Sequence, residues 1–398
     1  MTSMILTERP RRTALRAAWL FDGSGAALLA DPVVVFEGPS IVSVDPGGAA
    51  PSDVEVVDLG DATLLPGLVD THVHLAFDAS PDPVGRLAAR SDAEVQAAMR
   101  AAGRTALAGG VTTVRDLGDR GYLSLALRDE ESMPTVLAAG PPITTSAGHC
   151  YFLGGAARAG EDGLRAAVQQ HADHGVDVIK IMASGGSMTP GSHQHLAQFS
   201  AEELRAAADE AHRCGLPITA HAHATAAIKN AVSAGVDGLE HASFWSEDGV
   251  DDPGDMIELI AEKRIVVGAT FGFVPIPGMM PPPAILKRMP SVISNTRRMQ
   301  QAGVRVVAGT DAGIAPVKPH DALRYVIPQL IDLGMAAAEA LITITSVAAE
   351  VCGLVASKGR IAPGYDSDIL AIRGDPLTEP EAIHRIRAVY SRGRPAIS

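Results

Sequence analysis

The stretch "GLVDTHVHLAF", residues 67–77, places His72 and His74 two positions apart inside an apolar run. Side chains on a β-strand alternate between its two faces, so both imidazoles are expected to point to the same side. Burying two polar rings next to each other costs free energy unless each ring has a partner. The stretch therefore predicts a buried strand whose two histidines share a partner.

Further runs rich in β-branched residues follow along the chain and alternate with Ala-rich helical stretches. The eight strand candidates lie at residues 64–75, 110–118, 133–140, 175–186, 216–223, 236–243, 264–271 and 304–313. One intervening helix is expected at 200–215, where Ser200 and Glu203 form a capping-box pattern. Strands that alternate with helices in this way predict an α/β fold, a parallel (β/α)8 TIM barrel.

The two ends of the chain have a different pattern. Residues 14–45 and 358–377 alternate in hydrophobicity and turn at Gly, Pro and Asp, without a helical period. We expect these segments to pair into one small β-sandwich module beside the barrel. The expected domains are therefore residues 1–64 and 356–398 for the two parts of the module, and residues 65–355 for the barrel.

Composition limits the functions that are open to this protein. The 398-residue chain has 33 basic and 46 acidic residues, a net charge of −13 and no block rich in lysine and arginine. This balance argues against nucleic acid or an anionic membrane as a partner. Its three cysteines are scattered, which disfavours a disulfide framework, and no apolar run has the length of a membrane span. We expect a cytoplasmic protein with a small-molecule substrate, and whether it forms a homo-oligomer stays open.

Polar side chains recur on the inner face of several predicted strands. In chain order they are Lys180, Thr219, His221, His223 and His241, the last sharing its face with Leu239 and Ser243, and Asp311 at the end of the eighth strand. Because the C-terminal ends of barrel strands meet at one mouth, these side chains should converge with the histidines of the first strand. A set of histidines and carboxylate suits zinc, and less specifically iron, manganese or cobalt.

These motifs resemble the amidohydrolase superfamily, with HxH on strand one, Lys on strand four, His on strands five and six, and Asp on strand eight. The stretches "TTSAGHCYFLGG" (144–155) and "DVIKIMASGGSMTPG" (177–191) resemble its imidazolonepropionase-like and Xaa-Pro dipeptidase-like branch. The resemblance implies a centre of two divalent metal ions. The implied ligands are His72, His74 and Asp311 for one ion, His221 and His241 for the other, and a carbamylated Lys180 as the bridge.

The chemistry of Lys180 agrees with this implication. A lysine ammonium has only donors and cannot bind a cation. Buried beside two dications it would lose its proton, and the free amine can then add carbon dioxide to become an anionic carbamate. A hydroxide between the metals is the expected nucleophile, with Asp311 as general base and acid. The expected reaction is hydrolysis of a C–N bond in an amide, peptide or cyclic amide.

Substrate contacts are expected from residues nearer the mouth. His223 lies further along its strand than His221, and His149 is placed to hydrogen-bond the substrate carbonyl or the developing oxyanion. Tyr151 is expected to follow His149 into the pocket. Whether His193, His195 and His320 also reach the active site stays open.

The loop "FGFVPIPGMMPPPAIL", residues 271–286, is rich in proline and methionine. With Phe244 and Trp245 it predicts an apolar wall and hence a partly hydrophobic substrate. Dipeptidases of the branch that this sequence resembles recognise a free carboxylate with tyrosine or basic groups after strand five. The segment "HAHATAAIKN", residues 221–230, has no tyrosine there and only Lys229 further on. This departure from the resemblance argues against prolyl-dipeptide specificity.

Two alternatives stay open at this point. The same site would serve a carbamate, urea or ester hydrolase, because an activated hydroxide does not dictate the leaving group. A protein of another class, a catalytically silent metal-binding scaffold, is disfavoured because the implied ligand set is complete.

Overall fold

The computed structural model describes residues 12–25 and 27–397. They form two compact units. One unit comprises Val69–Ala336, and the other combines the described residues up to Leu68 with those from Ala337 onward.

The larger unit is built on eight strands. They are β8 (Leu68–Val73), β9 (Val111–Asp116), β10 (Thr135–Ala138), β11 (Ile179–Met182), β12 (Ile218–Ala224), β13 (Gly238–Trp245), β14 (Val266–Ala269) and β15 (Val306–Ala308). A three-stranded sheet, β10-β9-β8, and a five-stranded sheet, β11 to β15, contain them in this order. Parallel bridges between Ile143 and Ile181 and between Val73 and Ala312 join the two sheets into a closed circle. The predicted TIM barrel is therefore confirmed.

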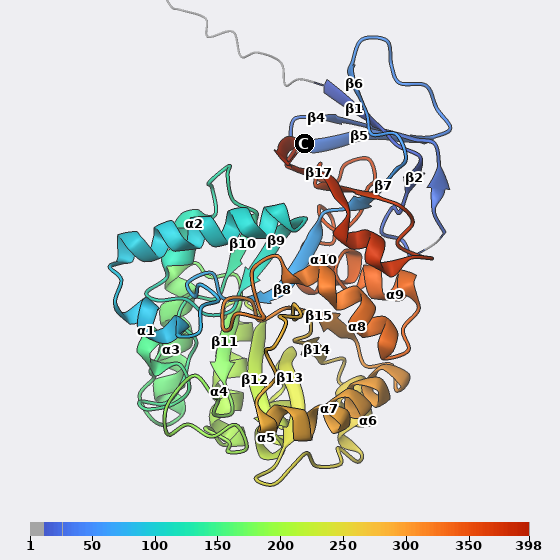
Figure 1. Cartoon of the computed structure of the whole chain (residues 1–398). Helices are drawn as coiled ribbons and strands as arrows, with labels where there is room; N and C mark the ends of the chain where they lie inside the picture. Colours follow the sequence, from blue (N-terminus) through green and yellow to red (C-terminus); the bar gives the residue numbers. More distant parts are fainter. Residues whose placement is uncertain (1–11, 26, 398) are drawn as a thin grey trace, which may run out of the picture. The chain divides into compact units, whose positions relative to one another are not determined.

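Helices lie between most of these strands and surround them (Figure 1), while only a short 3-10 helix, Leu123–Leu127, lies between β9 and β10. They are α1 (Pro83–Ala88), α2 (Asp92–Ala108), α3 (Glu161–His174), α4 (Ala201–Arg213), α5 (Thr225–Ala234), α6 (Met256–Glu262), α7 (Pro283–Gln301) and α8 (Val326–Asp332). Helix α4 begins after Ser200, whose hydroxyl accepts from the Glu203 N–H in the predicted capping box. Among the described residues, none of the helices combines the length and the apolar character needed to cross a bilayer.

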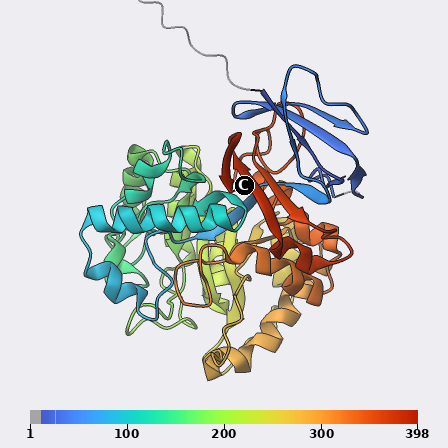
Figure 2. The same cartoon turned by 45° about the horizontal axis from the view of Figure 1, so that its top comes forward.

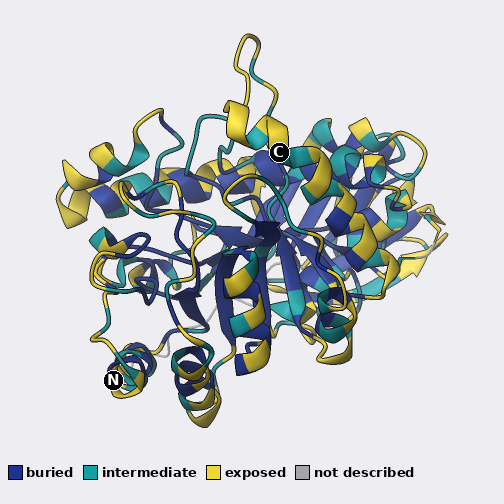
Figure 3. Ribbon diagram, turned by 90° about the horizontal axis from the view of Figure 1, so that it is seen from below, coloured by how far each residue is buried: buried dark blue, intermediate teal, exposed yellow. Residues whose placement is uncertain are grey.

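Apolar side chains fill the layer between the strands and the helices. Ile181, Ala220 and Leu239 on the strands pack in one cluster with Leu204 and Ile228 of the helices. Figure 3 shows the strands of the barrel as buried, while the outer faces of the helices are exposed. This layer holds the strands in place, and the ends of the strands carry the candidate site.

The smaller unit contains strands from both ends of the chain (Figure 2). One sheet has the order β5-β4-β1-β6 and the other the order β18-β17-β16-β7-β2-β3. The N-terminal strands are β1 (Arg12–Arg16), β2 (Trp19–Leu20), β3 (Leu29–Ala30), β4 (Pro32–Glu37), β5 (Ser40–Pro46), β6 (Glu55–Asp58) and β7 (Ala62–Pro66). Helices α9 (Ala337–Ile342) and α10 (Ser346–Val351) precede β16 (Ile369–Arg373), β17 (Ile386–Ser391) and β18 (Arg394–Ile397). The predicted pairing of the two chain ends is confirmed, since Pro66 of β7 lies opposite Ile369 of β16.

Strand β13 departs from simple alternation. Its register sets Leu239 beside Ala220 and Glu240 beside His221, so Leu239 packs in the apolar core and Glu240 points into the barrel. The expectation that Leu239 shares an inner face with His241 was wrong. His241 has a φ of 73°, a left-handed conformation that turns its side chain inward directly after Glu240. The strand therefore presents two consecutive polar residues to the barrel interior.

Candidate metal centre

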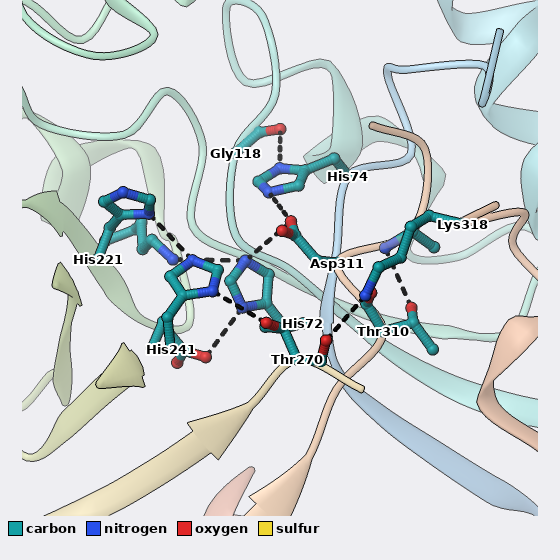
Figure 4. A network of polar contacts seen from close by, with 12 residues as sticks. His72, His74, Gly118, His221, His241, Thr270, Thr310, Asp311 and Lys318 are labelled. Carbon is teal, nitrogen blue, oxygen red and sulfur yellow. Dashed lines mark hydrogen bonds and ion pairs between the residues drawn. The ribbon is translucent and has the colours of Figure 1, made fainter. Parts of the chain in front are cut away.

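Two groups of side chains with metal-ligating atoms lie at the C-terminal ends of the barrel strands (Figure 4). In each group the ligand atoms are within 4.8 Å of one another. The first group is His72, His74 and Asp311, and the second is His221, His223 and His241. The structure thus brings together the histidines and the aspartate that the sequence singled out.

In the first group, two imidazoles face one carboxylate oxygen. His74 Nε2 lies 3.1 Å from Asp311 Oδ1, and His72 Nε2 lies 3.5 Å from the same atom. Asp311 is held there because its backbone N–H donates to the His72 carbonyl at 2.7 Å and its φ is 59°. His72 lies in β8, His74 directly follows that strand, and Asp311 lies in the turn after β15.

The other ring nitrogens of these histidines have partners of their own. His74 Nδ1 donates to the Gly118 carbonyl at 3.1 Å, and His72 Nδ1 donates to Glu240 Oε2 at 2.9 Å. A carbonyl and an ionised carboxylate only accept, so Nδ1 of each ring carries a hydrogen and Nε2 is the nitrogen left to bind a metal. Metal-binding histidines commonly have this arrangement, and the donor set therefore fits a divalent cation.

Burial and the contacts among these three side chains determine their pKa values. Burial tends to lower the pKa of His74, but the hydrogen bond and the charge of Asp311 outweigh it and raise that pKa. Burial lowers the pKa of His72 to about 4, so its ring is neutral near pH 7. Burial tends to raise the pKa of Asp311, but its interactions with His72, His74 and Lys318 outweigh burial and hold that pKa well below its usual range. The ionised Asp311 and the neutral His72 are in the protonation states that metal ligands require.

The second group has the same character. His221 Nε2 donates to the Gly185 carbonyl at 3.2 Å, which leaves a lone pair on Nδ1, 3.0 Å from His241 Nε2. His241 Nδ1 lies 3.0 Å from the Thr270 hydroxyl. Burial, followed by neighbouring histidines, holds the pKa values of His221 and His241 well below normal, so both rings are neutral. Neutral imidazole is the form that binds metal.

Lys180 lies inside the barrel beside the first group. Its Nζ is 3.5 Å from His72 Nε2, and the residue is 1% exposed. Burial lowers the pKa of its ammonium from 10.5 to about 8. This shift increases the fraction of Lys180 that is a free amine near neutral pH.

His223 is a member of the second group, and His149 borders that group. The His223 ring stacks on His241 with centroids 4.3 Å apart, and its Nδ1 lies 2.6 Å from the Ser243 hydroxyl. His223 is thus as close to His241 as the expected ligands are. His149 is 5% exposed, and its ring centroid is 4.8 Å from that of His221. Burial lowers the pKa of His149 to about 4 and that of His223 to about 3.

Tyr151, His320, His193 and His195, whose roles were expected or left open, lie outside the two groups of ligand atoms. Tyr151 is 45% exposed, and its ring faces Phe152 with centroids 6.1 Å apart. His320 is buried, and its Nε2 lies 3.2 Å from the His74 carbonyl, so it supports the backbone of a candidate ligand. His193 and His195 face each other with centroids 5.6 Å apart in the loop that follows β11.

The loop after β14 exposes apolar side chains while its base is fixed. Lys318 Nζ donates to the carbonyls of Thr270 and Thr310 at 2.8 and 2.7 Å, and Gln329 bonds the Gly272 N–H at 2.9 Å. The exposed apolar residues of the loop and of the start of α7 are Phe273, Met279, Met280 and Leu286. Such a surface fits an apolar group of a ligand.

The two aromatic residues at the end of β13 differ in position. Phe244 is wholly buried in the layer between strands and helices, so its expected place in the apolar wall was wrong. The Trp245 ring lies 5.2 Å from the ring of His223 and 4.7 Å from the guanidinium of Arg288. Trp245 therefore remains the aromatic residue of β13 beside the candidate centre.

Sequence reasoning missed several buried polar residues that support the candidate ligands. Glu240 contacts His72, Thr270 contacts His241, and Asp70 accepts from the backbone N–H of His72 and from the Thr310 hydroxyl. An acidic residue within an apolar strand was the available signal. Strict alternation of side chains along β13 predicted that Glu240 points away from the barrel interior, so its role was not recognised.

Comparisons with known proteins give consistent relatives. The family model described as "Amidohydrolase family" matches residues 63–396. Ochratoxinase from Aspergillus niger is 30% identical over 366 residues, covering 82% of this chain and 73% of ochratoxinase. Imidazolonepropionase from Caulobacter vibrioides is 27% identical over 396 residues, covering 89% of this chain and 90% of that protein. A crystal structure of a Xaa-Pro dipeptidase with bound methionine in the active site has a TM-score of 0.84 at 25% identity, covering 96% of this chain and 99% of that chain.

Proposed function

Since this chain belongs to the amidohydrolase family and is a hydrolase of carbon–nitrogen bonds, we propose that it cleaves an amide, peptide or cyclic amide bond of a small, partly apolar substrate. The observation that carries this proposal is the convergence of two ligand groups beside a buried lysine. His72 and His74 direct Nε2 toward Asp311, while His221 and His241 face each other at 3.0 Å.

Two divalent ions, zinc being the first candidate, fit these donors. His72, His74 and Asp311 would hold one ion, and His221 with His241 the other. When bound, such ions supply Lewis-acid activation of a water molecule and of the scissile carbonyl.

Lys180 has the chemistry to bridge the two ligand groups. Its free amine forms a C–N bond with carbon dioxide and releases one proton, which yields an anionic carbamate with two oxygens. This reaction reverses the charge of a side chain whose Nζ lies 3.5 Å from His72 Nε2. An ammonium at that distance would repel a cation bound to the same nitrogen.

Asp311 is the group proposed to move the proton. Its carboxylate is ionised and lies close to both His72 and His74, so it can accept a proton from the attacking water. It then delivers that proton to the leaving nitrogen, as a general base followed by a general acid.

His149 and His223 are proposed to act on the substrate. Both rings are neutral near pH 7, and both lie against the second ligand group. A neutral imidazole can donate one hydrogen bond to the substrate carbonyl and to the oxyanion that develops from it. Tyr151 is proposed as a further substrate contact, at the rim where it is partly exposed.

The apolar wall formed by the loop after β14 indicates the kind of substrate. Methionine side chains adapt their shape to different ligands, and both Met279 and Met280 are exposed there. We therefore expect the substrate to place an apolar group against this loop and its amide at the candidate centre.

A substrate screen combined with metal analysis tests the proposal. The purified protein is assayed with N-acyl amino acids, dipeptides and cyclic amides that differ in the apolar group, and with matched esters and carbamates. We expect two metal ions per chain and the fastest turnover among the amides with large apolar groups. Far fewer than two ions would contradict the binuclear centre, and turnover restricted to esters or carbamates would contradict the amide assignment.

A further inference from the structure

Glu240 is a buried carboxylate with a partner at each oxygen. Oε2 accepts from His72 Nδ1 at 2.9 Å. Oε1 accepts from the Thr219 hydroxyl at 2.7 Å and from the Arg115 guanidinium at 3.2 Å. The side chains of Glu240 and Arg115 are 2% and 8% exposed. A charge so far removed from water requires partners of this kind.

Two glycines leave room for this network. Gly268 is the neighbour of Glu240 in the register of β13 and β14, and a Cβ there would lie 2.2 Å from Glu240 Oε2. Gly238 is the neighbour of Thr219, and a Cβ there would lie 2.6 Å from the Thr219 hydroxyl oxygen. Any larger residue at either position would displace the carboxylate or the hydroxyl.

The contact with His72 determines which of its nitrogens carries the hydrogen. The Arg115 guanidinium is the cationic partner of the Glu240 carboxylate. Because an ionised carboxylate only accepts, His72 donates from Nδ1 and keeps its lone pair on Nε2. That Nε2 lies 3.5 Å from both Asp311 Oδ1 and Lys180 Nζ.

We propose that Glu240, held by Arg115 and Thr219, is the positioning residue that keeps His72 in the orientation and tautomer with which Nε2 binds a cation. The inference rests on the proposed function, because it concerns a ligand of that site. The charge of Arg115 alone would balance the charge of Glu240, so a purely structural ion pair would not require the further contact with His72. Partners that hold the second nitrogen of a metal-binding histidine typically contribute about 10- to 100-fold to metal affinity.

The experiment compares metal affinity and stability among metal-free variants. Glu240→Gln keeps the shape of the side chain and removes its charge. Thr219→Val leaves Glu240 in place and removes one donor to it. The control, Glu262→Gln, removes an equal charge at the exposed end of α6. Zinc is titrated into each apoprotein in competition with a chromophoric chelator, and the unfolding temperature of each apoprotein is measured.

We expect Glu240→Gln to lower the affinity for one of the two zinc ions by about 10- to 100-fold, while the affinity for the other ion changes by less than about threefold. Thr219→Val should lower the affinity for the same ion by a smaller factor, and its apoprotein should have the unfolding temperature of the wild type. Glu262→Gln should match the wild type for both ions.

If Glu240→Gln lowers the affinity for both zinc ions equally and also lowers the unfolding temperature of the apoprotein, Glu240 only stabilises the fold and the inference is overturned. Wild-type affinity in both Glu240→Gln and Thr219→Val would overturn it as well. A wild-type protein that binds no zinc contradicts the proposed function first and the positioning role with it. A failure of the positioning role alone is recognised by normal zinc binding in the wild type.

Discussion

In the metal-free protein, raising the pH should accelerate the reaction of Lys180 with carbon dioxide. Only the free amine reacts, and burial lowers the pKa of Lys180 from 10.5 to about 8. At pH 7 the free amine is then about 10% of the total, against about 0.03% for a lysine of ordinary pKa, a gain of about 300-fold. Because the free-amine fraction rises with pH until it passes the pKa, the initial rate should increase about tenfold from pH 6 to pH 7 and level off above about pH 8.

The reaction is followed by carbon-13 NMR after labelled carbon dioxide is added to the apoprotein at a fixed dissolved concentration. Lys180→Met should lack the slow-exchanging carbamate signal. Lys263→Met is the matched control, because Lys263 is an exposed lysine at the end of α6 and its loss should leave the signal and its pH dependence unchanged.

A rate that still rises steeply between pH 8 and pH 10 would refute the reasoning, since it would mean that Lys180 has the pKa of an exposed lysine. A carbamate signal that survives in Lys180→Met would assign the reaction to another amine. Either result would remove the proposed bridge between the two ligand groups.

Four further substitutions test the proposed roles of single residues. Asp311→Asn removes the proton acceptor, so kcat should fall by about 10²- to 10⁴-fold with an unchanged circular dichroism spectrum; near wild-type kcat would show that another group moves the proton. His72→Ala should lose metal in elemental analysis together with activity, whereas His149→Ala should keep its metal and lose turnover, and loss of metal in the latter would assign His149 to the ligands. Gly186→Ala places a Cβ 2.2 Å from His149 Nε2, so it should reproduce the kinetic defect of His149→Ala at full metal content, and wild-type kinetics would mean that the ring moves without consequence.

Periodicity predicted most of the barrel because most of its strands are regular. On β12, alternation correctly set Thr219 and His221 on one face, since both contact polar groups inside the barrel. On β13 it failed at Leu239 and Glu240, because His241 has a left-handed backbone that shifts the period by one residue. Such a break is usually marked by glycine, and "LEHASFW" contains none.

Of the candidate site, the ligand residues could be predicted from the sequence, but the contacts that hold them could not. Residue types and strand ends identified the histidines, Lys180 and Asp311, which the structure brings together. The contacts that hold these side chains were not predictable, because Gly118, Gly185 and Thr270 act through a carbonyl or a hydroxyl that ordinary loop residues also carry. The sequence also offered no means to see that His223 stacks on His241.

The pairing of β7 with β16 sets an order of events during synthesis of the chain. Pro66 and Ile369 are opposite each other in one sheet, yet about 300 residues are translated between them. At about 5–20 residues per second, β7 waits roughly 15–60 s on the ribosome for its partner. During that time the edge that β16 will cover has unpaired N–H and C=O groups and is open to association with other chains. The barrel segment is translated in this interval, so the small module is the last part of the protein to become complete, and a nascent chain that stops before residue 369 leaves β7 without its partner.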